Sequence, residues 1–252
     1  MCGIGGFSFY KDLKAIDNKS VCKDLAHRGP DDSGFFVDHP NGIVLAHTRL
    51  AIQDLSIQGH QPMFGENNLV VMVFNGEIYN FKALREELVD KGVKFKGNSD
   101  TEVLINLYLF EGHSMLRRLN GIFALAIWDA RDTTLFLARD ALGVKPLYFS
   151  TNDQYFSFAS EIKALKVYGS NFSLDPNSIN RYLSFLWCPG DGTPIQNVRK
   201  LLPGEAMTVK LGSIIKRWSW YQLPVFNHKI NYFSKNEAIE GTRKHLQNAV
   251  HR

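Results

Sequence analysis

The residue best suited to do chemistry is Cys2, which stands directly after Met1 in the sequence MCGIGGF. If Met1 is removed, Cys2 carries a thiol and a free α-amino group, with ordinary pKa values of about 8.5 and about 7.7–8.0. Proton transfer between the two is nearly isoergic, so a terminal thiol brings its own base and needs no partner histidine. We expect the glycines at positions 3, 5 and 6 to let the backbone bend tightly and to leave room for a substrate. A chance cysteine is the alternative interpretation.

A second candidate is the Asn-Gly pair in FNGEIYN, residues 74–80. Asn-Gly between apolar runs usually forms a β-hairpin turn. Here a strand pattern precedes the pair, but a helix cap follows within four residues. This predicts a strand-to-helix elbow with Asn75 and Gly76 at its tip. The elbow would present a side-chain amide and a backbone N–H together, and such a pair of donors stabilises an oxyanion.

Arg49 and Asp100 are candidates for binding the charged groups of a substrate. Arg49 ends the run IVLAHTR, and an Arg at the end of a buried strand matches a carboxylate with its forked guanidinium. Asp100 opens a predicted helix in GNSDTE, where the helix dipole alone accounts for most such acids. A ligand ammonium would be its functional partner. Together with the thiol and the oxyanion donors, these residues fit an α-amino acid whose side chain carries an acyl group.

The strands that must position these residues are marked by apolar runs. The runs at 69–74 and 122–128 are almost continuously apolar, which predicts strands covered on both faces. The turn DARDT predicts a hairpin between 122–128 and 134–139, and a second hairpin is expected after Pro203-Gly204, turning at Gly212-Ser213. The runs that predict single strands are 43–47, 69–74, 122–128, 134–139 and 155–159.

Helices are marked by their capping residues. Ser99 with Glu102, and Ser234 with Glu237, have the spacing of capping boxes. The remaining signals are N-caps at Asn80 and Asp175, Pro176 at a first helical position, and stops at Gly92 and Gly112. Strands in runs with helices between them predict sheets layered against helices.

The composition narrows the cellular setting and the partners. The net charge is +4 and the basic residues are scattered among acids, which argues against a nucleic-acid partner. No apolar run reaches the roughly 18–20 residues of a membrane span, and no secretory signal pattern is present, so we expect a cytoplasmic protein without a membrane partner. The three cysteines are widely spaced, which predicts neither a disulfide framework nor a metal site. Trp187, Trp218 and Trp220 could form an interface, for example in a homodimer.

The motifs, taken in order, resemble those of a known family. They are MCGI, HRGPD, HTRLAIQDLS followed by GHQPM, NGEIYN, SDTE, RDALGVKPLY and ASEIKAL. This set is similar to the glutaminase domain of glutamine-hydrolysing asparagine synthetases, which are class II glutamine amidotransferases, and it covers roughly residues 2–210. The resemblance implies an α+β protein with the N-terminal-nucleophile hydrolase fold. In that fold, two mostly antiparallel sheets lie between helices in a four-layer αββα sandwich.

The resemblance also implies roles for individual residues. Cys2 would attack the side-chain amide of L-glutamine and form a γ-glutamyl thioester, releasing ammonia, and water would then yield L-glutamate. The implied oxyanion hole is Asn75 and Gly76. Arg49 would bind the α-carboxylate, Glu77 and Asp100 the α-amino group, and backbone groups of Leu50, Ala51, Ile52 and Gln53 would complete the pocket. HRGPD (27–31) and RDALG (139–143) are interpreted as structural loops with no direct catalytic role.

The sequence departs from the family after the glutaminase motifs. Family members continue into an ATP pyrophosphatase domain with an SGGLDS-type loop, and no such loop occurs here. We therefore expect a glutaminase domain at 1–222, followed at 223–252 by a linker and the first helix of a synthetase domain that is missing from this chain. The glutaminase half would need no cofactor, whereas ATP and Mg²⁺ would serve only the missing domain, which is the ammonia acceptor.

Two other functions are compatible with the residues. The chain could be a non-catalytic module that binds glutamine or serves as a docking surface. It could also be an N-terminal-cysteine amidohydrolase acting on another amide, although such an enzyme would have no need for the pairing of Arg49 with Asp100.

Overall fold

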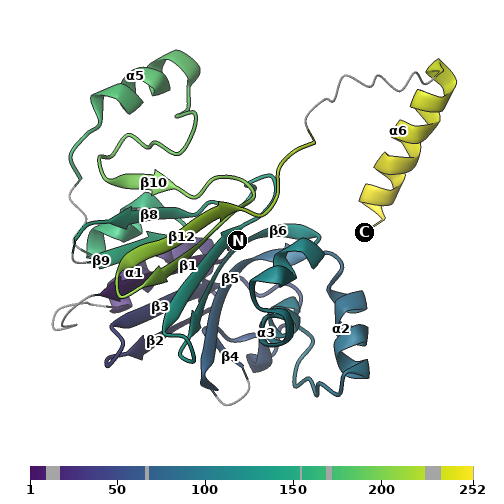
Figure 1. Ribbon diagram of the computed structural model, residues 1–252, viewed down its shortest axis with the longest axis horizontal. Helices are drawn as coiled ribbons and strands as arrows, with labels where there is room; N and C mark the ends of the chain where they lie inside the picture. Colours follow the sequence, from purple (N-terminus) through teal and green to yellow (C-terminus); the bar gives the residue numbers. More distant parts are fainter. Residues whose placement is uncertain (10–17, 66–67, 154, 169–171, 225–233, 252) are drawn as a thin grey trace. The chain divides into compact units, whose positions relative to one another are not determined.

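A computed structural model describes residues 1–9, 18–65, 68–153, 155–168, 172–224 and 234–251. The chain divides into two compact units, Met1–Tyr221 and Gln222–Arg252. The first unit holds every described strand, and its core is built from two antiparallel sheets (Figure 1). Each sheet contains six strands.

The first sheet has the strand order β10-β8-β9-β1-β3-β2, and the second has the order β12-β11-β7-β6-β5-β4. The strands of the first sheet are β1 (Gly3–Phe9), β2 (Asp32–Asp38), β3 (Ile43–Arg49), β8 (Tyr148–Thr151), β9 (Tyr155–Ala159) and β10 (Val198–Lys200). Those of the second sheet are β4 (Met63–Phe64), β5 (Val70–Ile78), β6 (Gly121–Asp129), β7 (Thr134–Arg139), β11 (Glu205–Lys210) and β12 (Ser213–Ser219).

Helices cover the outer faces of both sheets. The α-helices are α1 (Asn18–Leu25), α2 (Phe81–Asp90), α3 (Asp100–Glu111), α4 (Ile162–Leu165), α5 (Pro176–Phe185) and α6 (Lys235–Val250). Short 3₁₀ segments lie at η1 (Ala26–Arg28), η2 (Ile57–Gly59), η4 (Gly112–Arg118) and η5 (Lys166–Tyr168). Side chains of α2 and α3 pack with the outer face of the second sheet, and those of α1 and α4 pack with the outer face of the first. A third apolar cluster fills the space between the sheets. The four-layer αββα sandwich predicted from the resemblance is therefore confirmed.

The predicted strands and hairpins are present, with one shift of a turn. β5 and β6 each contribute side chains to the cluster between the sheets and to the cluster under α2 and α3, so both faces are covered, as their apolar sequences predict. β6 and β7 form the first hairpin. In the second hairpin Lys210 pairs with Ser213, so the turn is Leu211-Gly212 rather than Gly212-Ser213. Both turn residues have positive φ, and one of them, Gly212, is the residue type that adopts this conformation without strain.

The predicted N-caps are confirmed except at Asn80. The capping box predicted at Ser99 and Glu102 is only half formed, because the Glu102 carboxylate accepts from the N–H groups of Lys96 and Gly97. Ser99, Asp175 and Ser234 each accept a hydrogen bond from a backbone N–H of the first turn. The side chain of Asn80 makes no such bond. Its amide instead donates to the carbonyl of Arg118 and accepts from the N–H of Asn120, 2.9 and 3.0 Å away. This residue joins the start of α2 to the segment that leads into β6, because both groups lie within reach of its short side chain.

The glycines after Cys2 serve close packing rather than a bend. Gly3, Gly5 and Gly6 lie in the regular strand β1, which pairs with β3 on one side and β9 on the other. A Cβ on Gly3 would lie 2.7 Å from Thr48 Oγ1, and one on Gly6 would overlap the Phe158 ring. The expectation of a tight bend was wrong, because this segment is a regular strand paired on both sides. The glycines are needed because neighbouring side chains lie too close to the strand backbone for a Cβ.

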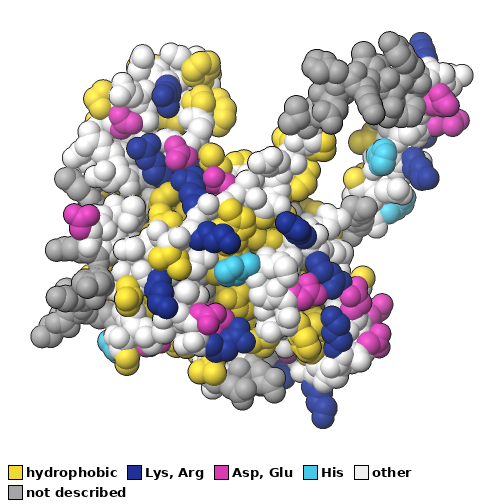
Figure 2. Space-filling model, viewed as in Figure 1, with side chains coloured by type: hydrophobic (Ala, Val, Ile, Leu, Met, Phe, Trp, Pro, Cys, Tyr) yellow, Lys and Arg dark blue, Asp and Glu magenta, His cyan; other side chains and the backbone are white. Residues whose placement is uncertain are grey.

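Several hydrophobic side chains are exposed over α5, as the upper left of Figure 2 shows. They are Tyr182, Leu183, Phe185, Leu186 and Trp187. Trp218 and Trp220, which the sequence offered as interface residues, are instead half-buried and stack on Phe136 and Phe123, with ring centroids 6.0 and 5.9 Å apart.

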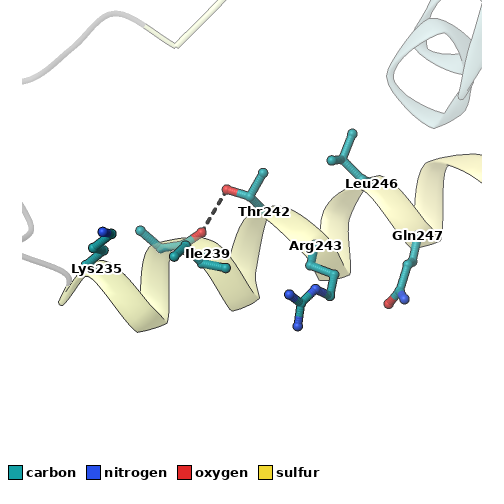
Figure 3. A pocket seen from close by; sticks show the side chains of 7 residues that line it. Lys235, Ile239, Thr242, Arg243, Leu246 and Gln247 are labelled. Atoms are coloured by element: carbon teal, nitrogen blue, oxygen red, sulfur yellow. Dashed lines mark hydrogen bonds between the residues drawn. The ribbon is translucent and has the colours of Figure 1, made fainter.

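The second unit is described through α6. The helix begins with the predicted capping box, in which Ser234 and Glu237 bond each other's backbone N–H. Figure 3 shows the face of α6 that carries Ile239 and Leu246, together with the Thr242 hydroxyl that donates to the carbonyl of Ala238 at 2.8 Å. Most of the predicted linker, residues 225–233, lies outside the described residues. Across the described part of the chain, no helix has the length and apolar character that crossing a membrane requires.

Candidate active site

Cys2 lies directly before β1, at one end of the sandwich. Its Sγ is 3.4 Å from the backbone N–H of Leu50, which donates to it, and 3.7 Å from the carbonyl oxygen of the same residue. The carbonyl of Cys2 accepts a hydrogen bond from Arg28 Nε at 2.9 Å. Cys2 is thereby fixed between the end of β3 and the HRGPD loop. Because it follows Met1, its nitrogen is a peptide amide until Met1 is removed.

The environment of the Cys2 thiol has opposing effects on its ionisation. Burial is the largest effect and raises the pKa of the Cys2 thiol above its ordinary value. The Leu50 N–H and the positive charges of the N-terminus, Arg49 and Lys145 all lower this pKa and partly offset burial. On balance the thiol is harder to ionise than an exposed cysteine, and the donors and cations named here are what favours its thiolate form.

Asn75 and Gly76 lie inside β5, not at the tip of an elbow. β5 pairs with β6 from Val70 to Ile78, so the strand continues through the NGEI sequence, and the connection to α2 is Tyr79 and Asn80. The predicted elbow was therefore wrong, as was the hairpin alternative. Asn-Gly can remain extended here because β6 supplies a complete partner strand.

Side chains replace a neighbouring strand along the other edge of β5. β4 pairs only with Val71 and Met72. Beyond it, the N–H of Phe74 donates to Gln61 Oε1 at 2.7 Å, and the N–H of Ile78 donates to Asp100 Oδ2 at 3.0 Å. Strand geometry repeats every two residues, so the N–H of Gly76 points from the same edge, between these two bonded groups. Gly76 lines the same pocket as Cys2, which makes its N–H available to a ligand there.

The side chain of Asn75 is a buried donor without an acceptor. Asn75 is only 1% exposed, and no described group accepts a hydrogen bond from its Nδ2. A buried, unpaired donor is costly in a folded protein and is commonly explained by a ligand. Nearby, His47 Nε2 donates to the Phe74 carbonyl at 3.2 Å, and complete burial lowers the pKa of His47 to about 3, so this histidine is neutral. The backbone before Asn75 is thus held by His47 and Gln61.

Arg49 ends β3 and enters the pocket almost fully buried. Its Nη1 donates to the Ser56 carbonyl at 2.9 Å, and its Nη2 donates to the Asp54 carbonyl. A guanidinium has five N–H donors, so these two bonds leave donors for a carboxylate. The structure therefore places the predicted carboxylate-binding residue in the pocket and shows that it also holds the loop after β3.

Asp100 and Glu77 supply negative charge to the same pocket. Burial, together with the charge of Glu77, raises the pKa of Asp100 to about 6, although the N–H of Ile78 acts in the opposite direction. Asp100 is thus mainly ionised at pH 7. Glu77 is exposed and accepts a hydrogen bond from Gln53 Nε2 at 3.1 Å. Two carboxylates at this end of the pocket suit an ammonium group.

The structure brings together all of the predicted site residues except Ala51. The pocket is lined by Met1, Cys2, Arg49, Leu50, Ile52, Gln53, Asp54, Gly59, Gln61, Phe74, Asn75, Gly76, Glu77, Ser99, Asp100, Thr101 and Lys145. Ala51 does not line it, and its N–H donates instead to Asp31 Oδ2 at 2.8 Å. Among the described residues, no group of three or more His, Cys, Asp and Glu side chains is arranged to hold a metal ion.

Sequence reasoning missed Gln61 and Lys145. Gln61 lies in the quoted GHQPM motif but was assigned no role there, because its role is to bond the edge of a strand that the sequence does not place beside it. Lys145 lies within the quoted RDALGVKPLY motif, two residues beyond the stretch that was interpreted as a structural loop. That motif was the one signal that could have drawn attention to it.

Comparisons with known proteins agree with this geometry. Residues 1–221 match the family model described as a glutamine amidotransferase domain. The chain is 38% identical over 216 residues to asparagine synthetase [glutamine-hydrolyzing] 1 of Bacillus subtilis, covering 83% of this chain and 34% of that protein. It is 31% identical over 271 residues to the putative asparagine synthetase [glutamine-hydrolyzing] 2 of Methanocaldococcus jannaschii, covering 99% of this chain and 52% of that protein. The chain thus spans about a third to about half of the length of these relatives.

A solved structure has the same fold. Glutamine phosphoribosylpyrophosphate amidotransferase from B. subtilis, complexed with ADP and GMP, superposes with a TM-score of 0.65. The alignment covers 88% of this chain and 50% of the other, at 20% identity. At that identity the likeness establishes the N-terminal-nucleophile hydrolase fold.

Proposed function

This chain belongs to the glutamine amidotransferase domain family, and on that basis we propose that it hydrolyses L-glutamine to L-glutamate and ammonia with Cys2 as the nucleophile. The observation that carries the proposal is the pairing, in one pocket, of the Cys2 thiol with the buried and unpaired Nδ2 donor of Asn75. A nucleophile beside a donor that the fold itself does not use is the arrangement that acyl transfer requires.

In the first step, removal of Met1 frees the α-amine of Cys2, which takes the thiol proton. The thiolate attacks the side-chain amide carbon of glutamine, and the C–S bond forms as the C=O π electrons move onto oxygen. Asn75 Nδ2 and the N–H of Gly76 donate to this oxyanion. The intermediate then expels ammonia, which leaves with the proton held by the α-amine, and the γ-glutamyl thioester remains.

In the second step, water attacks the thioester carbon, and the α-amine takes a proton from it. The same two donors stabilise the second oxyanion, and the C–S bond breaks as the protonated α-amine returns its proton to the departing sulfur, which gives glutamate and the free thiol. Throughout both steps, Arg49 binds the α-carboxylate, and Asp100 with Glu77 binds the α-ammonium group. These contacts fix the amide above Cys2, so binding at the charged end positions the reacting end.

We predict that Cys2→Ala abolishes release of glutamate and ammonia from glutamine, because no other described thiol lines the pocket. Cys22→Ala is the matched control: Cys22 is a half-buried thiol whose Sγ lies 3.8 Å from the carbonyls of Gly34 and His47, and it is absent from the pocket lining. It should retain activity. The measurements are coupled assays for both products, and intact mass to verify removal of Met1.

Undiminished glutamine hydrolysis by Cys2→Ala would overturn the proposal. Binding of glutamine without turnover, in protein that has lost Met1, would favour the non-catalytic module instead. A panel of larger amides tests the remaining alternative, since faster cleavage of these than of glutamine would indicate a different amidohydrolase.

The further partners belong to the same proposal. Because the relatives are named as glutamine-hydrolysing asparagine synthetases, we propose that the ammonia passes to an ATP-dependent synthetase domain. ATP and Mg²⁺ would act there, and glutamine hydrolysis itself would need no cofactor. A cytoplasmic location fits biosynthetic chemistry of this kind. Homodimer formation stays a prediction, to be tested by the solution mass of the protein.

A further inference from the structure

Lys145 is a cation in the pocket that holds Cys2, and glutamine hydrolysis as proposed gives this lysine no role. It lines the same pocket as Cys2, Asn75 and Arg49, and it is only 9% exposed. Lysine is rarely buried to this extent without a compensating function or partner. The sequence places it in RDALGVKPLY, whose loop comes between β7 and β8.

The loop fixes the backbone of Lys145 from both sides. Its N–H donates to Asp140 Oδ2 at 3.0 Å, and its carbonyl accepts from Arg139 Nε at 2.7 Å. Asp140 is itself buried and accepts further N–H bonds from Phe123, Leu142 and Val144 at 3.0–3.2 Å. These two bonds fix where the Lys145 side chain leaves the backbone, and burial of that side chain restricts the positions open to its charge.

The other charged groups around Cys2 already have assignments. Arg49, at the end of β3, holds the carbonyls of Asp54 and Ser56. The carboxylates facing the pocket are Asp54 on the loop after β3, Glu77 on β5 and Asp100 at the start of α3. Arg28 in the HRGPD loop donates to the Cys2 carbonyl at 2.9 Å and is paired with Glu161 at 3.0 Å. The α-amine of the chain is a further titratable group near the thiol. Lys145 is thus the pocket cation that neither holds the loop nor is needed for the substrate carboxylate.

We propose that Lys145 supplies a fixed positive charge that stabilises the thiolate of Cys2, and that Arg139 and Asp140 are the positioning residues that hold it there. The inference rests on the proposed role of Cys2. Its physical basis is Coulombic: a cation held close to a sulfur in a partly dry pocket favours the ionised form, and the effect is larger than in water because screening is weak. The positive charge of Lys145 also lowers the pKa of the Cys2 thiol, against the effect of burial.

The test is the pH dependence of alkylation of Cys2 by iodoacetamide, followed by peptide mass spectrometry so that Cys22 and Cys188 are resolved separately. Lys145→Met keeps the length of the side chain but removes the charge. We expect the midpoint of its alkylation profile to move to higher pH, and its rate at pH 7 to fall by about three- to tenfold. Lys145→Arg should restore the wild-type profile, and Lys82→Met, on the exposed face of α2, should leave it unchanged.

An unchanged profile in folded Lys145→Met would overturn the proposal. If that variant does not fold, Lys145→Gln offers the same test, because it also removes the charge and keeps a polar tip. A shift in Lys82→Met equal to that in Lys145→Met would also contradict it, since the effect would then be one of net charge. Alkylation does not require turnover, so this result is independent of whether Cys2→Ala loses glutamine hydrolysis, and the two proposals can fail separately.

Discussion

At the residue scale, the unpaired Nδ2 donor of Asn75 is the group whose removal should affect the rate of catalysis and leave glutamine binding nearly unchanged. The fold gains no hydrogen bond from Nδ2, and a buried donor without a partner costs free energy unless a ligand accepts from it, which indicates a role toward the ligand. Asn75 lies on the same face of β5 as Val71 and Val73, which enter the core between the sheets. Its amide therefore points inward to the end of the sandwich where Cys2 lies.

We predict that Asn75→Ala lowers kcat for glutamine by about 10²–10³-fold with little change in KM, because the oxyanion forms only after binding. Steady-state kinetics with glutamine measure both constants. The melting temperature should change little, because Nδ2 makes no bond in the folded protein. A rise in KM at constant kcat would instead assign Asn75 to ground-state binding.

The candidate site could be predicted from the sequence as a set of residue types, but its geometry could not. Cys2, Arg49, Asn75 and Asp100 carry recognisable chemistry, and all four line one pocket. Gln61 and Lys145 lie in quoted motifs, but the sequence assigns them no role, because their roles depend on which strand edge and which loop the fold brings beside them. Long-range placement of this kind is not encoded in periodicity.

At the element scale, β5 explains why local sequence rules failed at the Asn-Gly pair. Asn-Gly favours a turn when the residues on either side can pair with each other. Here β6 pairs with the whole of β5, and Gln61 and Asp100 bond the opposite edge. The tertiary partners of the strand override the turn preference of the pair. The strands and capped helices with strong periodic signals were predicted correctly, because their patterns depend only on near neighbours.

We predict that Gly76→Ala destabilises the first unit by about 2–3 kcal/mol. An added Cβ would overlap the carbonyl oxygen of Ile122 and lie 2.8 Å from Phe123 Cα, and both are backbone atoms of β6 that cannot rotate away. Thermal or denaturant unfolding measures the change. Gly241→Ala is the control, because no atom lies within 4 Å of its added Cβ; this variant should not be destabilised. Equal stability of Gly76→Ala and wild type would show that β5 and β6 can separate at this point.

At the scale of the whole molecule, the proposed chemistry belongs to one unit. Every residue that lines the pocket lies within Met1–Tyr221, and none of the described residues of α6 is buried. The four-layer fold could be expected from the ordered motifs, whereas the assignment of residues 223–252 to a synthetase domain remains a prediction that α6 alone does not test. The two compact units divide after Tyr221, and the domain junction expected at 222 stays a prediction.

The boundary itself gives the last prediction. A chain ending after Gln222 should keep the melting temperature and the kcat/KM for glutamine of the full chain, because it retains both sheets and the pocket. A chain ending after Ser219 should have a lower melting temperature and a lower kcat/KM. It loses Trp220, whose Nε1 donates to the carbonyl of Arg139 at 3.0 Å and whose ring stacks on Phe123.

The loss of this half-buried ring should cost about 2 kcal/mol and lower the melting temperature by about 4–8 °C. It should also lower kcat/KM, because Arg139 holds the backbone of Lys145 and would lose the contact that orders its own carbonyl. Calorimetry and glutaminase kinetics on the two shortened chains measure both effects. The contrary result would be a loss of activity in the chain ending after Gln222, with no further loss in the chain ending after Ser219. In that case the second unit would be part of the catalytic fold, and the division at Tyr221 would not be a functional boundary.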